Sequence, residues 1–162
     1  MIRRPLRMVW LCAALAGLAP PAHAHDAAPA AQASIAEQTD WGIAGKAGDA
    51  TRTIPIRMTD DMRFTPDRLT VRSGETIRFV IKNAGKRLHE MVIGTPGVIA
   101  EHAALMKKFP KMEHAEAHMS HVRAGQAGEI LWHFNRTGTF EFACLVGRHY
   151  EQGMRGTIEV KP

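Results

Sequence analysis

The segment Thr76-Ile-Arg-Phe-Val-Ile-Lys82 decides the fold class, because its polar and apolar side chains alternate along the chain. Ile77, Phe79 and Ile81 fall on the same face, as they do in a strand that is buried on one side. A Ser-Gly-Glu turn precedes the segment and an Asn-Ala-Gly turn follows it. We therefore expect a short strand here, with one face in a hydrophobic core.

The same pattern recurs on both sides of this segment, with turn-forming residues in between. Further strands are predicted at residues 53–58, 69–72, 89–94, 129–135, 139–145 and 156–160. Short strands separated by turn signals at this spacing are typical of sheet sandwiches. The sequence therefore predicts an all-β fold, a Greek-key antiparallel β-sandwich.

Residues 95–128 interrupt the strand pattern. Thr95-Pro96 is a typical helix start, since a hydroxyl residue can cap the first turn and Pro fits within it. Pro110 ends the helical pattern, and the residues after it are polar and carry several His and Met. We expect a short helix-plus-loop insertion at about 95–128 within the sandwich.

Residues 1–24 have the three parts of a secretory signal peptide. Three arginines in the first seven residues precede an apolar run at residues 8–19, and Ala22-His-Ala24 is a small-x-small cleavage site. A membrane anchor is the alternative, but a run of about a dozen residues is too short to span a bilayer as a helix. We expect export to the periplasm and no stable membrane insertion after cleavage.

Residues 25–52 are rich in Ala and Gly and show no clear periodicity. We expect a flexible N-terminal segment there, followed by a single domain at residues 53–162. Removal of the three signal arginines lowers the formal charge from +5 to +2, since no acidic residue leaves with them. This charge, with scattered Lys and Arg, is not that of a nucleic-acid-binding protein.

Cleavage also removes Cys12 and leaves Cys144 as a lone thiol in an exported protein. Such a thiol is expected to be a metal ligand, part of an intermolecular disulfide, or an inert buried residue. Cys144 is followed by His149 and Met154 with the spacing Cys-x4-His-x4-Met. A trigonal set of two His and one Cys, with a weak axial Met, binds copper in type 1 (blue) centres.

The second His of such a set must come from another strand. His89 opens the strand predicted at residues 89–94, 55 residues before Cys144, so a sandwich can place it beside the loop. Thiolate and thioether ligands favour Cu(I), and imidazole suits copper in general. We therefore expect a type 1 copper centre whose ligands are His89, Cys144, His149 and Met154.

These motifs resemble the cupredoxins of the plastocyanin/azurin family over residues 54–160. The resemblance rests on Phe64-Thr-Pro66, Gly74-Glu75, Asn83-Ala-Gly85, His89-Glu-Met-Val-Ile-Gly94 and the loop from Cys144 to Met154. The segment at residues 102–114 is similar to the insertion of periplasmic copper-tolerance (CopI-like) cupredoxins. The resemblance implies the same four copper ligands. The sequence departs from it at Glu90, where many relatives have an Asn that ties the ligand loops together.

A second group of residues of metal-binding types lies in a ten-residue stretch inside the insertion. It consists of Met112, His114, His118, Met119 and His121. If this stretch is helical, the three His share one face and could hold additional copper ions. The alternative is a solvated loop that is rich in His.

Three further residues could also take part in copper binding. His102 and Met106, four residues apart on the expected helix, could extend the second group. His25 becomes the N-terminus after cleavage, and its amino group and imidazole together can chelate Cu(II). The sequence therefore allows more than one copper ion per chain.

The two metal motifs favour copper handling, or copper tolerance, with cycling between Cu(I) and Cu(II). The alternative is a dedicated one-electron carrier for a respiratory or other redox partner, which gains nothing obvious from additional soft ligands. A metal-free interaction module leaves the Cys-x4-His-x4-Met spacing unexplained. An enzyme such as a nitrite reductase or multicopper oxidase needs a His beside the Cys, whereas Ala143 and Leu145 flank Cys144. We expect a monomer whose partner is a redox protein or a copper-exporting system. We expect no enzymatic activity, with oxidation of Cu(I) as the alternative that stays open.

Overall fold

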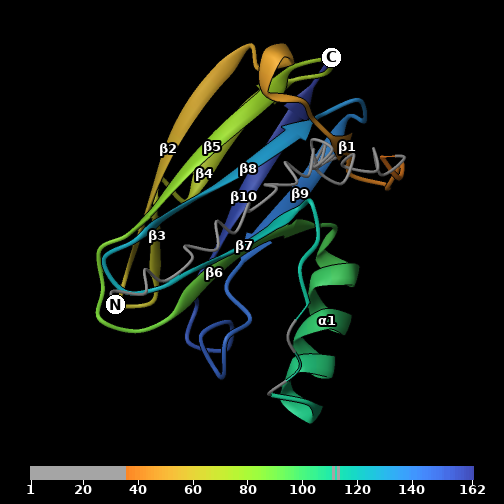
Figure 1. Ribbon diagram of the computed structural model, residues 1–162. Helices are drawn as coiled ribbons and strands as arrows, with labels where there is room; N and C mark the ends of the chain where they lie inside the picture. The colour runs from red at the N-terminus through yellow and green to blue at the C-terminus, as the bar shows by residue number, and fades with distance from the viewer. Residues whose placement is uncertain (1–35, 111, 113) are drawn as a thin grey trace, which may run out of the picture. The chain divides into compact units, whose positions relative to one another are not determined.

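The computed structural model describes residues 36–110, 112 and 114–162. The predicted signal peptide at residues 1–24 and His25 lie outside these residues. The described chain forms two five-stranded sheets and one α-helix (Figure 1). Among the described residues, no helix has the length and apolar character needed to cross a bilayer.

Each sheet has a defined strand order. In the first sheet the order is β1 (Ile43–Ala44), β8 (Ala127–His133), β5 (Thr76–Asn83), β2 (Arg52–Thr59) and β3 (Arg63–Thr65). In the second sheet it is β4 (Arg68–Arg72), β10 (Arg155–Lys161), β9 (Gly138–Ala143), β6 (His89–Gly94) and β7 (Met119–Val122). The expected all-β sandwich is therefore confirmed. The predicted strands correspond within a few residues to β2, β4, β5, β6, β8, β9 and β10, whereas the short strands β1, β3 and β7 were not predicted.

The core lies between the two sheets and contains the side chains that alternate inward. Phe79 and Trp132 project from the first sheet, and Phe142 and Ile158 from the second, and all four are almost fully buried. Phe64 of β3 and Phe142 of β9 meet edge to face, with ring centroids 5.0 Å apart. Burial of these large side chains is the main stabilising contribution of the sandwich.

The sheets are mixed, which corrects the expectation of antiparallel pairing throughout. Strand β2 pairs in parallel with β5, and β10 pairs in parallel with β4. Parallel neighbours need a crossover connection, and here the chain runs from β2 through β3 and across to β4 in the other sheet before it returns as β5. Side-chain alternation is the same in both directions, so the sequence pattern does not reveal this difference.

The sandwich includes part of the segment that was expected to be flexible. Strand β1 pairs with β8, and a 3₁₀ turn, η1 (Ala47–Asp49), leads into β2. Trp41 is buried, and its carbonyl oxygen accepts a hydrogen bond from the indole of Trp132 at 3.0 Å. The ordered domain therefore begins before residue 53.

The helix α1 (Pro96–Lys108) occupies the predicted insertion. Thr95 caps it, since its hydroxyl oxygen accepts a hydrogen bond from the Val98 amide at 3.2 Å. Ile99 is fully buried against Val92, Ala143 and Leu145, so the helix packs on β6 and β9 beside the predicted ligand loop. The helix start is confirmed, but the expected loop after it contains the edge strand β7, which pairs with β6.

Candidate metal centre

The structure brings three predicted ligands together at one end of the second sheet. His89 opens β6, Cys144 directly follows β9, and His149 lies in the β9–β10 loop. The Cys144 Sγ atom lies 3.3 Å from His149 Nδ1 and 3.9 Å from His89 Nδ1. All three side chains are buried, and their ligand atoms lie within 4.8 Å of one another. These atoms surround a point that one metal ion can occupy.

Met154, the predicted axial ligand, lies next to this group and is completely buried. The Cys144 amide donates a hydrogen bond to the Met154 carbonyl at 3.0 Å, and the Met154 amide donates to the His149 carbonyl at 3.0 Å. These bonds fold residues 144–154 into a closed loop. The Cys-x4-His-x4-Met spacing is therefore the length at which a single loop brings all three residues together.

Asp60 fixes the orientation of His89, and sequence reasoning did not identify it. His89 Nε2 donates to Asp60 Oδ1 at 3.0 Å, which leaves the Nδ1 lone pair directed at Cys144. Asp60 also accepts hydrogen bonds from the backbone amides of Lys86 and Arg87. The Lys86 amide, and then His89, lower the pKa of Asp60 to about 2, so it is a carboxylate at neutral pH.

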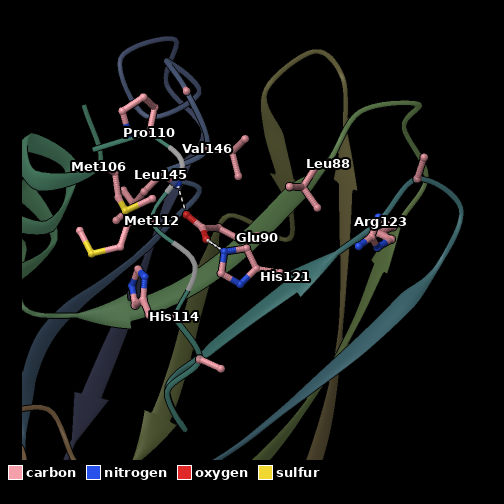
Figure 2. Close-up of a pocket in the computed structure, with 13 residues that line it drawn as sticks. Leu88, Glu90, Met106, Pro110, Met112, His114, His121, Arg123, Leu145 and Val146 are labelled. Atoms are coloured by element: carbon pink, nitrogen blue, oxygen red, sulfur yellow. Dashed lines mark hydrogen bonds and ion pairs between the residues drawn. The ribbon is translucent and has the colours of Figure 1, made fainter. Parts of the chain in front are cut away.

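Glu90 ties the two ligand-bearing segments together. It is 2% exposed, and its Oε1 atom accepts a hydrogen bond from the Leu145 amide at 2.7 Å. Its own amide points at the Cys144 sulfur at 3.4 Å. Figure 2 shows the Glu90 carboxylate between Leu145 and His121, and Oε2 pairs with His121 Nε2 at 2.7 Å. Glu90 thus makes the contact between the loops that the resemblance ascribes to Asn.

Burial sets the protonation of the ligand atoms. Loss of water raises the pKa of the Cys144 thiol to about 12, and it lowers the pKa of His149 and so favours its neutral form. Neutral imidazole is the ligand form of His, and a cation at the centre displaces the thiol proton. Two imidazoles, one thiolate and a neighbouring thioether in a dry pocket fit copper and not a hard cation such as magnesium.

Comparison with known proteins agrees with this geometry. The profile of the family described as copper binding proteins, plastocyanin/azurin family, matches residues 52–161. The chain belongs to this family. The match covers all of the second sheet and the four residues of the centre, so the family resemblance seen in the sequence is confirmed.

Two relatives of this cupredoxin carry the same name. The chain is 42% identical to the copper-resistant cuproprotein CopI of Rubrivivax gelatinosus, over 99% of this chain and 100% of that protein. It is 33% identical to the protein of the same name from Pseudomonas aeruginosa, over 82% of this chain and 88% of the relative. The first alignment spans nearly all of both proteins, so it includes the residues of the helical insertion.

Solved structures show the same fold. Reduced auracyanin from Roseiflexus castenholzii superposes with a TM-score of 0.61 at 25% identity, over 70% of this chain and 99% of that chain. Auracyanin B superposes with a TM-score of 0.62 at 20% identity, over 76% of this chain and 100% of that chain. Both auracyanins match over nearly their whole length, whereas about a quarter to a third of this chain has no counterpart in them.

The second predicted group of this cupredoxin is divided by the structure. His114 and His121 lie together, with ring centroids 6.4 Å apart. His118 instead packs against Trp41 and Trp132, with centroids 5.2 and 5.9 Å from theirs. The expected common helical face is therefore not formed, because residues 114–118 are not helical.

Met119 and Met112 also lie in different environments. Met119 is the first residue of β7, and it is buried beside Ile99 in the small core under α1. Met112 is exposed and lines a cavity with His114 and His121. Met119 and His121 are two residues apart in β7 and so lie on the same face of the strand, but Met119 is covered by the small core under α1, whereas His121 lines the cavity. His102 of α1 and Met106, which were expected to extend the group, lie on the cavity side with His114.

Proposed function

We propose that this chain is an exported type 1 copper protein that handles copper in the periplasm and confers copper tolerance. The observation that carries the proposal is the buried group of His89, Cys144 and His149 beside Met154. Membership of a copper-binding family and the names of full-length relatives support it. The N-terminal sequence, with its basic start, apolar run and cleavage site, supports export.

The protein residues determine how such a centre works. Bound copper supplies a one-electron couple between Cu(I) and Cu(II). Asp60 holds the His89 ring, and Glu90 holds the two ligand segments in register, so the ligand atoms are kept in place by hydrogen bonds to the surrounding protein. The same burial that keeps water from Cys144 also limits the movement of the ligands, which suits a site that serves both oxidation states.

A role in tolerance is favoured over a dedicated carrier by the residues outside this centre. His102, His114 and two methionines near them are of soft or borderline ligand types, and a dedicated electron carrier gains nothing obvious from additional residues of these types. We further propose that the chain is not an enzyme, since Ala143 and Leu145 replace the adjacent His that would lead to a second catalytic copper. Its partner is then a redox protein or a copper-exporting system.

Visible spectroscopy tests the type 1 assignment. The purified mature chain loaded with Cu(II) is expected to show an intense absorption band from charge transfer between the Cys144 thiolate and the metal. Cys144→Ala removes the thiolate and is expected to abolish this band, while circular dichroism shows that the sandwich remains folded. An absence of the band in the wild-type chain contradicts the assignment.

Growth in copper tests the role. In a bacterium that lacks its own copper-tolerance cupredoxin, the wild-type chain is expected to raise the copper concentration that stops growth, and Cys144→Ala is not. A purified chain that shows the band but leaves this limit unchanged is a carrier and not a tolerance protein. Mass spectrometry of the periplasmic fraction tests export, since the mature chain is expected to begin at His25.

A further inference from the structure

A pair of histidines outside the type 1 centre faces nitrogen to nitrogen. His102, on α1, and His114, which follows the helix, have their Nε2 atoms 2.8 Å apart and their ring centroids 4.8 Å apart. The Nδ1 atom of His114 is buried and has no hydrogen-bond partner among the described residues. Burial also lowers the pKa of His102, which favours the neutral ring. With the ring proton of each on Nδ1, these two imidazoles can direct both Nε2 lone pairs at one cation.

Two thioethers lie beside this pair. Met106 follows His102 by four residues on α1, so both side chains leave the same face of the helix. Met106, Met112 and His114 line one cavity of about 1050 Å³, and Figure 2 shows the two methionines on the same side of it as the His114 ring. Thioethers are soft ligands that select Cu(I), whereas hard cations prefer oxygen.

We propose that His102, His114, Met106 and Met112 form a second metal site, which binds Cu(I). At metal–nitrogen distances of about 2.0–2.1 Å, two nitrogens 2.8 Å apart subtend nearly a right angle at the metal. Opening this angle to a tetrahedral one separates the two nitrogens by only about half an ångström. This adjustment lies within the reach of side-chain rotation, because Met112 and His114 belong to an irregular segment between α1 and β7.

The second site adjoins the type 1 centre through residues of the same cavity. Leu145, which is bonded to Cys144, lines this cavity together with Glu90. Glu90 accepts a hydrogen bond from the Leu145 amide and pairs with His121, whose ring lies 6.4 Å from that of His114. The cluster therefore lies in the same cavity as residues next to the type 1 ligand loop.

Anaerobic titration with Cu(I), in competition with a chromophoric chelator, tests this site on the full mature chain. The double variant H102A/H114A is expected to bind one Cu(I) fewer than the wild-type chain and to keep the type 1 visible band after loading with Cu(II). Met106→Leu with Met112→Leu preserves volume and is expected to weaken the same ion by at least tenfold. Because each variant is compared with the wild type, copper bound elsewhere in the chain does not affect the difference.

His118→Gln is the matched control, since His118 belongs to the same sequence cluster but packs against two tryptophans. It is expected to leave the Cu(I) count unchanged. NMR of the histidine rings gives a second measurement, and Cu(I) is expected to shift the His102 and His114 signals together. An unchanged count in H102A/H114A, or a loss in His118→Gln instead, overturns the proposal. Cys144→Ser distinguishes the two centres, since it abolishes the visible band and leaves the shifts of His102 and His114 intact.

Discussion

At the scale of single residues, Asp60 decides which nitrogen of His89 is available to a metal. Its carboxylate accepts a hydrogen bond from Nε2, with Nε2 and Oδ1 3.0 Å apart, and the opposite nitrogen faces the cysteine. Groups that orient a ligating His in this way typically contribute 10–100-fold to metal affinity. We therefore expect Asp60→Ala to lower copper affinity at the type 1 centre by about one to two orders of magnitude, as measured by chelator competition.

The neighbouring Asp61 provides a control for this substitution. It is exposed, and it contacts the Thr59 hydroxyl and not a predicted ligand. Asp61→Ala is expected to leave copper affinity unchanged. Equal losses of affinity in the two variants would mean that the turn as a whole matters, and not the bond from Asp60 to His89.

The buried carboxylate of Glu90 is the hydrogen-bond acceptor for the backbone amide of Leu145. Glu90→Ala leaves the Leu145 amide without its acceptor beside the ligand loop, and an unsatisfied buried amide costs about 1–3 kcal/mol. We expect a loss of this size in the free energy of unfolding of the metal-free chain, measured with urea. Glu90→Gln keeps a carbonyl oxygen at this position and is expected to lose less. A larger loss in Glu90→Gln than in Glu90→Ala contradicts this role.

At the scale of elements, Ile99 is the residue that attaches α1 to the sandwich. It is fully buried, whereas Leu105 on the same helix is 44% exposed. Truncation of a buried Ile to Ala typically costs about 2–5 kcal/mol. Because the apolar packing of α1 on the sandwich is a small separate core, we expect Ile99→Ala to release the helix locally, and hydrogen exchange of its amides to accelerate while that of β5 and β8 stays slow.

Leu105→Ala is the matched control for this experiment and is expected to leave exchange unchanged. Release of α1 moves His102 away from His114, so Ile99→Ala is also expected to weaken Cu(I) binding at the second site. The type 1 band is expected to persist, since its ligands come from β6 and the β9–β10 loop. Loss of that band in Ile99→Ala would show that the helix supports the type 1 loop as well.

The elements also show why the sequence predicts some features and not others. The strand containing Ile77, Phe79 and Ile81 was predictable because alternation is a local property. Strand β7 was not, since its four residues form a strand through hydrogen bonds to β6, a partner distant in sequence. The type 1 ligands were predictable because three of them share one loop with fixed spacing. Asp60 was not, because it lies 29 residues from His89 in a turn of the other sheet.

At the scale of the whole molecule, the Asp60–His89 bond connects the two sheets at the metal centre. Asp60 lies between β2 and β3 of the first sheet, and His89 opens β6 of the second. A metal that fixes His89 therefore also restrains the first sheet. Ligand binding to the folded state alone stabilises it by about 2.7 kcal/mol when the free ligand exceeds its dissociation constant 100-fold.

Copper at a free concentration 100-fold above its dissociation constant is therefore expected to raise the free energy of unfolding of the wild-type chain by up to about 2.7 kcal/mol. The unfolded chain still carries Cys144, His149 and Met154 close together in sequence, and any copper that it binds subtracts from the gain. Only folding adds His89 to these three, so His89→Ala is expected to remove most of the stabilisation while copper still binds. Equal stabilisation of wild type and His89→Ala would place the metal on the loop alone, independent of the sandwich that positions the fourth ligand.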